Sequence, residues 1–561
     1  MSGPSRPSFT PALFAVFAEG YDARAFRVDA VAGLTVAIVA LPLSMAIAIA
    51  SGVGPDRGLF SAIVGGFLVS LLGGSRFQIG GPAGAFIVLI STTVARYGVD
   101  GLLTATLLSG VLLTVIGVLR LGTFIRYIPY PVTVGFTAGI AVTIFASQLR
   151  EMLGLRLAQE PGPIVDKLIA LAAAAPTANP AAIGVTALAI AVILAVRRWR
   201  PHWPGMLIAV VLCGGLVWAT GLPVNTIGSA FGGIPNGLPA PRLPDLSWAM
   251  VGAVWPVAVA FALLGSIESL LSAVVADSMS GRRHDSNMEL AAQGIANIGA
   301  ALFGGFCVTG TIARTATNVR AGARGPVAGM LHSVFLLLFM LVAAPLARFI
   351  PLAALAGVLG VVAANMAERH QFWTLLRASA GDAVVLLATF LLVVFRDLTE
   401  GILVGFGLGT LLFMHRMAGA AEVTRPEAAA FDPALTTDRD IIVYRISGAF
   451  FFGAAGAMGA ALDRIGEHPR AYVVDVSEVT VLDSTGAMAI EGVVRRAARV
   501  GATLYVAGAS RTVRRVLLVH GVRPPMVRFA GSVAAAITLF RSRSVGSSLD
   551  GPSAAVSPRA P

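Results

Sequence analysis

Long apolar runs, separated by short polar or turn-rich stretches, fill the first 420 residues of the chain. The run at 31–50 is uncharged and close to the roughly 20 residues that cross a bilayer. Runs of this composition predict membrane-spanning helices. They are expected at about 31–50, 59–72, 77–95, 102–119, 128–147, 181–196 and 206–220, and again at 250–276, 288–304, 311–319, 327–346, 352–366, 381–396 and 400–414.

The runs fall into two sets of seven, and the third run of each set is short and interrupted. Gly80, Gly81 and Pro82 interrupt the first set, and Gly310 interrupts the second. Paired interruptions at corresponding positions are typical of inverted-repeat transporters, which bind substrate near the bilayer midplane. We therefore expect an α-helical polytopic membrane protein with about 14 spans in two inverted seven-helix repeats. Pro42 is expected to break the first helix.

The pattern changes after Met417. Residues 441–446 predict a strand and 448–465 a loop and a helix, and from Ala471 a strand, loop, helix and strand follow. Strands alternating with helices indicate a small α/β domain. The expected boundaries are 1–27 for a cytoplasmic N-terminal segment, 28–420 for the membrane domain, 421–438 for a linker, 439–543 for the α/β domain and 544–561 for a disordered tail.

Composition agrees with a membrane protein, because 56% of residues are hydrophobic and only 12% are charged. The net charge of +12 comes from arginines at the ends of apolar runs, which is the positive-inside pattern and excludes nucleic acid as the expected partner. This distribution of arginines predicts a multi-pass protein of the cell (inner) membrane with both termini in the cytoplasm. Arg57, Arg150 and Arg396 are exceptions, since they fall in predicted external connections.

Two charges stand inside apolar sequence, Glu268 and Arg314. A charge at membrane depth is costly by roughly 3 kcal/mol or more and is functional by default. If Ala83 and Thr311 lie near the N-termini of two facing half-helices, the space between them favours an anion. One alternative is that the glycines only permit close helix packing. Another is a structural ion pair between Glu268 and Arg314.

Several motifs occur together and in one order. They are DAVAGLTVAIVALPLSMAIAIASGV, GGSRFQIGGPAGAF, IPYPVTVGFTAGIA, LGSIESLLSAVVADSM and IARTATNVRAGARGPVAG. The chain resembles the sulfate permease (SulP) family of anion transporters, and DRDIIVYRI through VLDSTGAMAI is similar to the STAS domain of such proteins. The resemblance implies a core and a gate domain, an elevator-like movement and a homodimer.

It also implies an anion between helices 3 and 10, near helices 1 and 8. Proton-coupled sulfate uptake fits best, with Glu268 taking the proton; a C4-dicarboxylate or bicarbonate carrier, and an anion-binding membrane sensor, are the alternatives. Relatives often have Pro-Gln-Gly in the first helix and some have Phe where Ala83 stands, whereas sodium-coupled relatives have Asp for Glu268 and no Arg at 314. The implied substrate residues are Pro42, Leu43, Ser44, Gly81, Pro82, Ala83, Thr311, Ile312, Ala313 and Arg314, and the coupling-ion residues are Glu268 and Ser272.

The STAS region carries one candidate regulatory residue, Ser484, in the sequence Asp483-Ser484-Thr485-Gly486. It resembles a loop that is phosphorylated on serine in anti-sigma-factor antagonists, and a helix N-cap is the alternative. A cytoplasmic protein could bind this domain.

Nothing in the sequence indicates an enzyme, a metal site or a cofactor. His202, His284 and His415 are expected at solvated or interfacial positions. Cys213 and Cys307 are expected to be packing residues.

Overall fold

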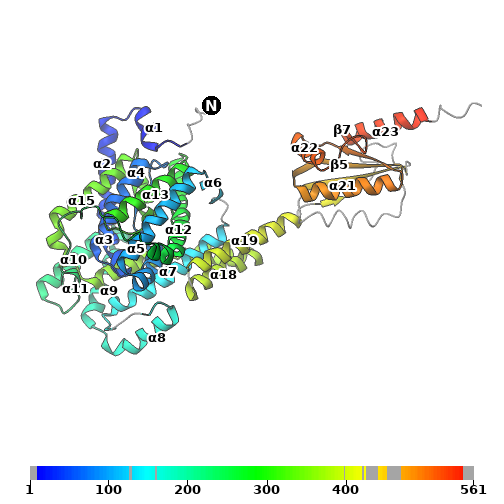
Figure 1. Ribbon diagram of the computed structural model, residues 1–561. Helices are drawn as coiled ribbons and strands as arrows, with labels where there is room; N and C mark the ends of the chain where they lie inside the picture. Colours follow the sequence, from blue (N-terminus) through cyan, green and yellow to red (C-terminus); the bar gives the residue numbers. More distant parts are fainter. Residues whose placement is uncertain are drawn as a thin grey trace, which may run out of the picture. The chain divides into compact units, whose positions relative to one another are not determined.

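The computed structural model describes residues 9–125, 129–157, 161–201, 203–396, 398–419, 422–424, 440–450 and 469–547. Two compact units divide the chain, Met1–Gly409 and Thr410–Pro561. Figure 1 shows that the first is helical and that the second contains a sheet. His202, most of the predicted linker, most of the predicted loop and helix at 448–465, and the tail beyond 547 lie outside the described residues.

Eight helical stretches in the described part of the first unit are long and apolar enough to cross a membrane. They are α2 (Ala23–Ala50), α3–η1–α4 (Pro55–Phe60, Ser61–Gly65 and Gly66–Leu72), η2–α5 (Gly84–Phe86 and Ile87–Val118), α7 (Tyr130–Leu153), α9 (Pro180–Trp199), α12 (Trp248–Ser280), α15 (Val327–Ala347) and α16–α17 (Leu352–Met366 and Arg369–Ala378).

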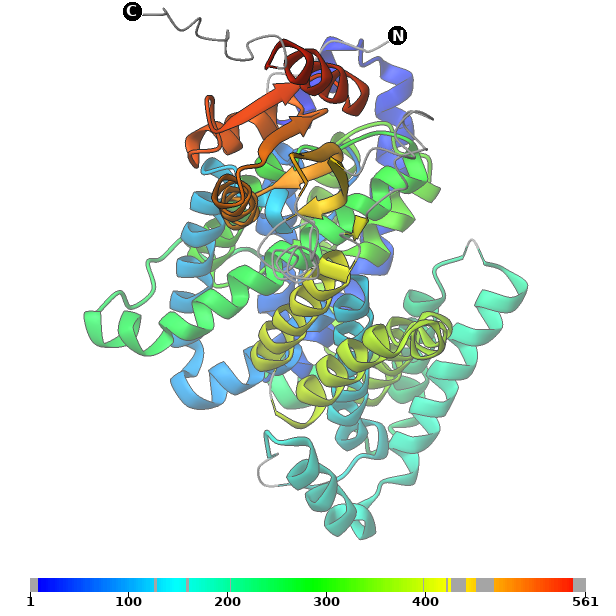
Figure 2. The ribbon, with the colours of Figure 1, turned by 90° about the vertical axis from the view of Figure 1, so that its right-hand side faces the viewer.

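The predicted runs at 77–95 and 102–119 both fall on the η2–α5 stretch, and the remaining runs lie on five shorter or separately assigned helices. These are α10 (Gly205–Thr220), α13 (Ser286–Leu302), α14 (Ile312–Arg320), α18 (Ala380–Phe395) and α19 (Leu398–Gly419). Small elements connect them: α1 (Ala12–Ala18), α6 (Gly122–Ile125), α8 (Ile164–Ala174), η3 (Ala175–Thr177) and α11 (Ile227–Phe231). Figures 1 and 2 show α1 at one end of this unit and α8 at the opposite end.

Pro42 does not break the first helix, so that expectation is wrong. Helix α2 runs without interruption from Ala23 to Ala50, after Asp22 caps it by accepting a hydrogen bond from Ala25 N at 2.7 Å. A proline removes one backbone donor, but neighbouring helices and side chains stabilise such positions in membrane helices. The real interruption lies at Gly98, where a φ of 69° divides the long α5 stretch into two helices.

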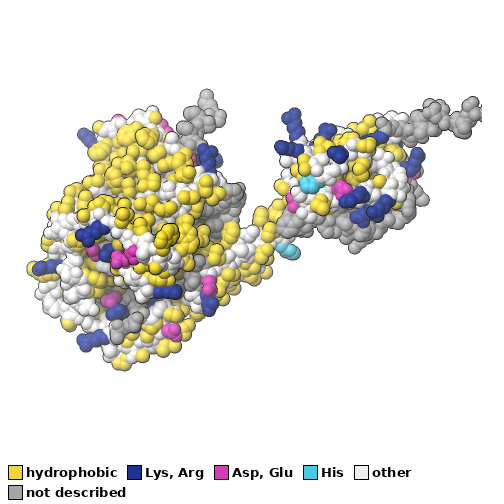
Figure 3. All heavy atoms as spheres, in the orientation of Figure 1, with side chains coloured by type: hydrophobic (Ala, Val, Ile, Leu, Met, Phe, Trp, Pro, Cys, Tyr) yellow, Lys and Arg dark blue, Asp and Glu magenta, His cyan; other side chains and the backbone are white. Residues whose placement is uncertain are grey.

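Apolar side chains dominate the face of the helical unit that Figure 3 displays. Exposed Leu, Val, Phe and Trp residues occur on α5, α10, α15, α18 and α19. Such a surface would be unfavourable in water and is the surface that lipid solvates. Cys213 and Cys307 are buried, as expected for packing residues.

The second unit holds a five-stranded sheet in the order β3 (Glu422–Thr424), β4 (Ile441–Phe450), β5 (Ala471–Leu482), β6 (Thr503–Ala507) and β7 (Val527–Ala530). Only β3 is antiparallel to its neighbour; the other pairs are parallel. Alternate strand residues face two buried clusters, one with α21 (Ser484–Arg499) and α22 (Arg511–Val519) and the other with α23 (Val533–Ser547). The predicted α/β domain is confirmed, although α23 continues into the predicted tail.

Candidate functional site

Two short strands at the centre of the helical unit bring the interrupted runs together. β1 (Gly80–Gly81) pairs antiparallel with β2 (Thr309–Gly310), so that Gly80 lies opposite Gly310 and Gly81 opposite Thr309. Each strand leads directly into a helix, η2–α5 after β1 and α14 after β2. The first turns of two helices therefore start side by side, and their unpaired N–H groups and positive dipole ends favour an anion.

Side-chain hydroxyls fix the start of α14. Thr311 N donates to Ile79 O at 3.0 Å, and Thr315 Oγ1 accepts from Ile79 N at 3.1 Å. Ser272 of α12 donates its hydroxyl to the same Thr315 Oγ1 at 3.0 Å. Ser269 Oγ lies 2.8 Å from Thr309 Oγ1 and accepts from Gly310 N at 3.2 Å. Helix α12 thus holds both β2 and the first turn of α14.

One buried face of α13 holds the chain on both sides of the strand pair. Glu289 Oε2 accepts from Ser75 N at 2.8 Å, in the segment that leads to β1. Asn297 accepts from Val308 N at 2.8 Å and donates to Val308 O at 3.0 Å, just before β2, and Gln293 also donates to Val308 O at 2.7 Å. The three side chains are spaced by four residues, which places them on one helix face. All three are almost completely buried.

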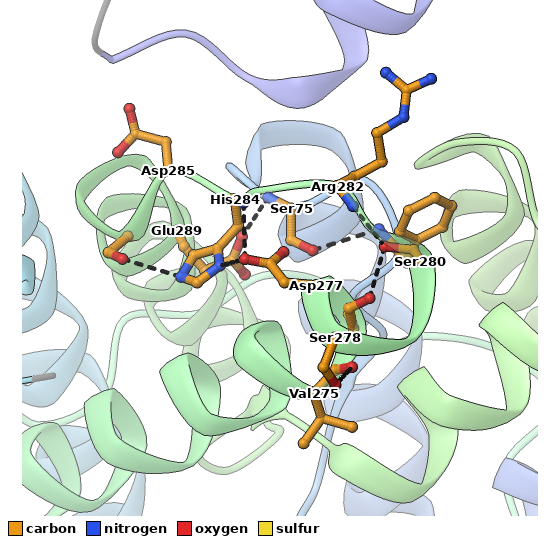
Figure 4. A network of polar contacts seen from close by, with 12 residues as sticks. Ser75, Val275, Asp277, Ser278, Ser280, Arg282, His284, Asp285 and Glu289 are labelled. Carbon is orange, nitrogen blue, oxygen red and sulfur yellow. Dashed lines mark hydrogen bonds and ion pairs between the residues drawn. The ribbon is translucent and has the colours of Figure 1, made fainter.

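The turn between α12 and α13 carries a polar network that Figure 4 shows from close by. His284 Nδ1 lies 2.7 Å from Asp277 Oδ2, and its Nε2 lies 3.0 Å from Ser286 Oγ. Asp285 caps α13 and accepts a hydrogen bond from Phe9 N at 3.2 Å. His284 is therefore buried in the turn between α12 and α13 and not solvated, and its two ring nitrogens lie within hydrogen-bond distance of Asp277 and Ser286.

The turn that follows α14 is anchored to α2. Asp29 Oδ1 accepts from Arg324 N at 2.6 Å, and Asp29 Oδ2 accepts from the hydroxyl of Tyr21 at 2.7 Å. Burial and this hydrogen bond raise the pKa of Tyr21. The start of α14 and the turn that follows it are thus both held by the rest of the unit.

Arg314 is the largest fully buried side chain of the described residues, at 1% exposure. Its Nη2 donates to Ser44 Oγ at 3.1 Å and to Pro82 O at 3.3 Å. Its Nε and Nη1 have no hydrogen-bond partner among the described residues. Buried donors are normally paired, so two unpaired nitrogens on one buried guanidinium require an explanation.

Glu268 of α12 is also buried, at 7% exposure. The structure records no ion pair between it and Arg314, and Glu268 makes no hydrogen bond to the described part of the chain. Ser272, one helical turn further along α12, donates its hydrogen bond to Thr315 and not to Glu268. The structure therefore does not contain the salt bridge considered from sequence.

Three of the predicted substrate residues meet at the guanidinium of Arg314, namely Ser44, Gly81 and Pro82. Pro42 instead lines a different cavity, together with residues of α10 and α15. Pro42, Leu43 and Ser44 are buried on α2, and Ser44 contacts Arg314. Gly81 is so close to Arg314 that a β-carbon at residue 81 would overlap Nη1. Four residues keep a trace of accessible surface, 7–9% each: Leu43, Ala83, Glu268 and Thr311. Of the others, Ile312 is half-buried and Ala313 exposed.

Sequence reasoning missed Gln78, His332 and the polar face of α13. The amide atoms of Gln78 and both ring nitrogens of His332 are buried without a partner among the described residues. Gln78 lies against Gly310, where a β-carbon would overlap its amide. The polar residues at 289, 293 and 297 recur every four residues in an apolar run, and this spacing could have predicted a polar helix face. Gln78 and His332 are single polar residues, and no sequence pattern predicts their role.

In the α/β unit, Asp483 caps α21 by accepting a hydrogen bond from Gly486 N at 2.7 Å. Ser484 is the first residue of that helix and is exposed. The N-cap predicted for this loop is thus present at Asp483.

Comparison with known proteins gives the following matches. Residues 26–389 match the sulfate permease family, and residues 432–536 match the STAS domain. The chain is 38% identical over 504 residues to "Putative sulfate transporter YvdB" of Bacillus subtilis, covering 89% of this chain and 94% of that protein. It is 31% identical over 515 residues to "Bicarbonate transporter BicA" of Synechocystis, covering 87% and 89%.

Two solved structures resemble the fold. SLC26A9 superposes with a TM-score of 0.82 at 17% identity, over 98% of this chain and 99% of the other. The transmembrane domain of a cyanobacterial BicA superposes with a TM-score of 0.61 at 30% identity, over 69% of this chain and 98% of the other.

Proposed function

The chain belongs to the sulfate permease family of anion transporters, as a multi-pass membrane protein with a STAS domain, and we propose that it is a secondary active transporter that moves sulfate together with protons. One observation carries this proposal: β1 and β2 bring two helix starts together beside a buried guanidinium with two unpaired nitrogens. A tetrahedral dianion matches that arrangement, because arginine donors recognise oxyanions and helix N-termini favour negative charge.

In this account the anion binds between the starts of η2–α5 and α14, the half-helices expected as spans 3 and 10. Arg314 supplies N–H donors through Nε and Nη1, while Ser44 and Pro82 O orient its Nη2. Thr311 and Ala83 contribute the first turns of the helices. A cation in the first turn of a helix opposes the local dipole, and a bound anion removes this conflict.

We assign the binding of the coupled proton to Glu268. It is buried near the strand pair and makes no ion pair that would hold it charged between turnovers. A carboxylate that takes a proton when the anion binds reduces the charge that must cross the membrane. Ser272 acts in this account mainly by orienting Thr315. We further propose cytoplasmic termini, a homodimer and the cell membrane as location.

Bicarbonate is the second candidate substrate, because the 31% identity to BicA covers most of both proteins. A C4-dicarboxylate would require more space beyond Arg314 than sulfate does. An anion sensor would bind without moving anion.

A panel of unlabelled sulfate, succinate, fumarate, bicarbonate and chloride, competing against labelled sulfate uptake into proteoliposomes at two pH values, separates these functions. Sulfate should inhibit most strongly; inhibition by dicarboxylates or bicarbonate alone would overturn the assignment, and binding without flux would indicate the sensor.

Ser484 is proposed as a regulatory phosphorylation site, since it is exposed at the start of α21. A phosphate at a helix N-terminus is favoured by the dipole and could recruit a cytoplasmic partner. Mass spectrometry of the protein purified from its native cell tests this, and consistent absence of phosphoserine would exclude it.

A further inference from the structure

Three arginines do not follow the positive-inside pattern, Arg57, Arg150 and Arg396. Arg57 has a structural role, because its Nη1 donates to Gly304 O at 2.7 Å in the turn before β2. The other two line the same cavity. The positive-inside rule explains arginines on the cytoplasmic side only. The presence of two arginines in one external cavity therefore needs another explanation.

The cavity has a volume of about 560 Å³ and lies between several helices of the first unit. Its wall is formed by the last turns of α2 and α7, the first half of α5, the start of α16, the end of α18, and Arg396 and Leu398. The last turns of α2 are at the end opposite the Asp22 cap. With a cytoplasmic N-terminus, this is the external end of the unit.

Cations outnumber carboxylates on this wall. The described lining includes Arg150, Lys167 and Arg396, and Glu151 as the single carboxylate. Arg150 Nε lies 3.8 Å from Glu151 Oε1 and Arg150 Nη2 donates to Leu157 O at 3.4 Å, while Arg396 Nε lies 3.2 Å from Glu400 Oε2. Because walls of low dielectric focus the field of such charges, a described lining with three cations and one carboxylate favours an anion.

The cavity also extends toward the candidate site. Ile87 and Val88 line it, and they directly follow η2, whose preceding residue is Ala83. Ser91, Thr92, Ser147 and Gln148 add neutral polar groups to the wall. An anion that enters the cavity is therefore brought to the helix α5 whose start we assign to substrate.

We propose that this cavity is an external capture site for small oxyanions, in which Arg150, Lys167 and Arg396 concentrate the substrate before it reaches Arg314. The proposal rests on the function and orientation proposed above. Such a site changes the rate of association from one side of the membrane and leaves the opposite side unaffected. Its effect must also weaken as ionic strength rises.

The test uses the full chain with Cys213→Ala and Cys307→Ala, and with Thr92→Cys as a reporter in the cavity wall. Membrane-impermeant methanethiosulfonates, one anionic and one cationic, are applied to intact cells, and the ratio of their labelling rates measures the local potential. The ratio of the anionic to the cationic labelling rate should be higher for the protein than for a free thiol in solution. Each neutralised arginine should lower the ratio about four-fold at low salt, because each rate changes about two-fold for a charge roughly 10 Å away in water.

Arg150→Gln with Arg396→Gln should therefore abolish most of the preference, and Arg150→Lys with Arg396→Lys should retain it. Inorganic sulfate should slow labelling in the parent more than in the double Gln variant. An unchanged ratio in the double Gln variant, or labelling only from the inside of inverted vesicles, would overturn the proposal.

Labelling does not depend on transport, so the two proposals can fail separately. A parent protein that labels with anion preference but moves no sulfate would contradict the proposed function and leave the capture site standing. Where sulfate flux is present, its external KM should rise in the double Gln variant while the KM from the internal side is unchanged. Because equilibrium across the membrane fixes the ratio of kcat/KM in the two directions, kcat for outward flux should fall by the same factor. An equal rise in KM on both sides would contradict capture at the external end.

Discussion

The guanidinium of Arg314 lies directly against the α-carbon of Gly81, so that a β-carbon at residue 81 would occupy the place of Nη1. The absence of a side chain on β1 therefore determines where the buried charge of α14 can lie. Gly81 thereby also leaves Nη2 within reach of Ser44 and Pro82 O.

Gly81→Ala should displace the guanidinium and weaken anion binding without unfolding the protein, because the atom that must move is the end of a flexible side chain. The KM for the transported anion should rise about ten-fold, which corresponds to roughly 1.4 kcal/mol. Gly265→Ala is the matched control, since its β-carbon would make ordinary contacts at 3.7 Å. An unchanged KM in Gly81→Ala, with the control also unchanged, would show that the position of Arg314 is not important for binding.

Ser44→Ala removes one of the two hydrogen bonds that orient Arg314. The expected result is a rise in KM of about five-fold, or about 1 kcal/mol, with little change in thermal stability. Ser51→Ala is the control, because Ser51 directly follows the same helix and its hydroxyl donates only to the carbonyl of Ile47 in that helix. Equal kinetics for the two variants would argue against an orienting role for Ser44.

Asn297→Leu removes both hydrogen bonds to Val308 and leaves a buried N–H unpaired. We expect a loss of about 2 kcal/mol in unfolding free energy and a lower apparent Tm in detergent, together with reduced flux. Asn365→Leu, which loses only an exposed contact with Arg197, provides the control. If Asn297→Leu unfolded at the temperature of the parent, the contact of α13 with Val308 would not contribute to the stability of the strand pair.

Much of the membrane unit could be predicted from the sequence, because lipid requires each span to satisfy its own backbone and to be apolar throughout. The glycines of β1 and β2 could be located because they interrupt such runs. The continuity of α2 through Pro42 could not be predicted, since it depends on packing by neighbouring helices. The contact of Arg314 with Ser44, instead of Glu268, depends on side-chain directions across elements more than 200 residues apart in sequence.

Glu268→Gln tests the coupling role. A neutral amide cannot exchange a proton, so a pH gradient should no longer drive net uptake, while exchange of labelled for unlabelled anion at equal pH should continue in part. Glu289→Leu is an informative companion, because it removes the acceptor of Ser75 N and should reduce both activities through structure. Full pH-driven uptake in Glu268→Gln would mean that another group carries the proton.

The most direct measurement is the accumulation of labelled sulfate in proteoliposomes that contain the purified full chain and have an alkaline interior. Proton-coupled transport predicts uptake above the external concentration, which collapses when a protonophore dissipates the gradient and is lost in Arg314→Gln. Sulfate that only equilibrates regardless of the gradient would contradict the coupling, and the absence of any sulfate flux would contradict the proposed function itself.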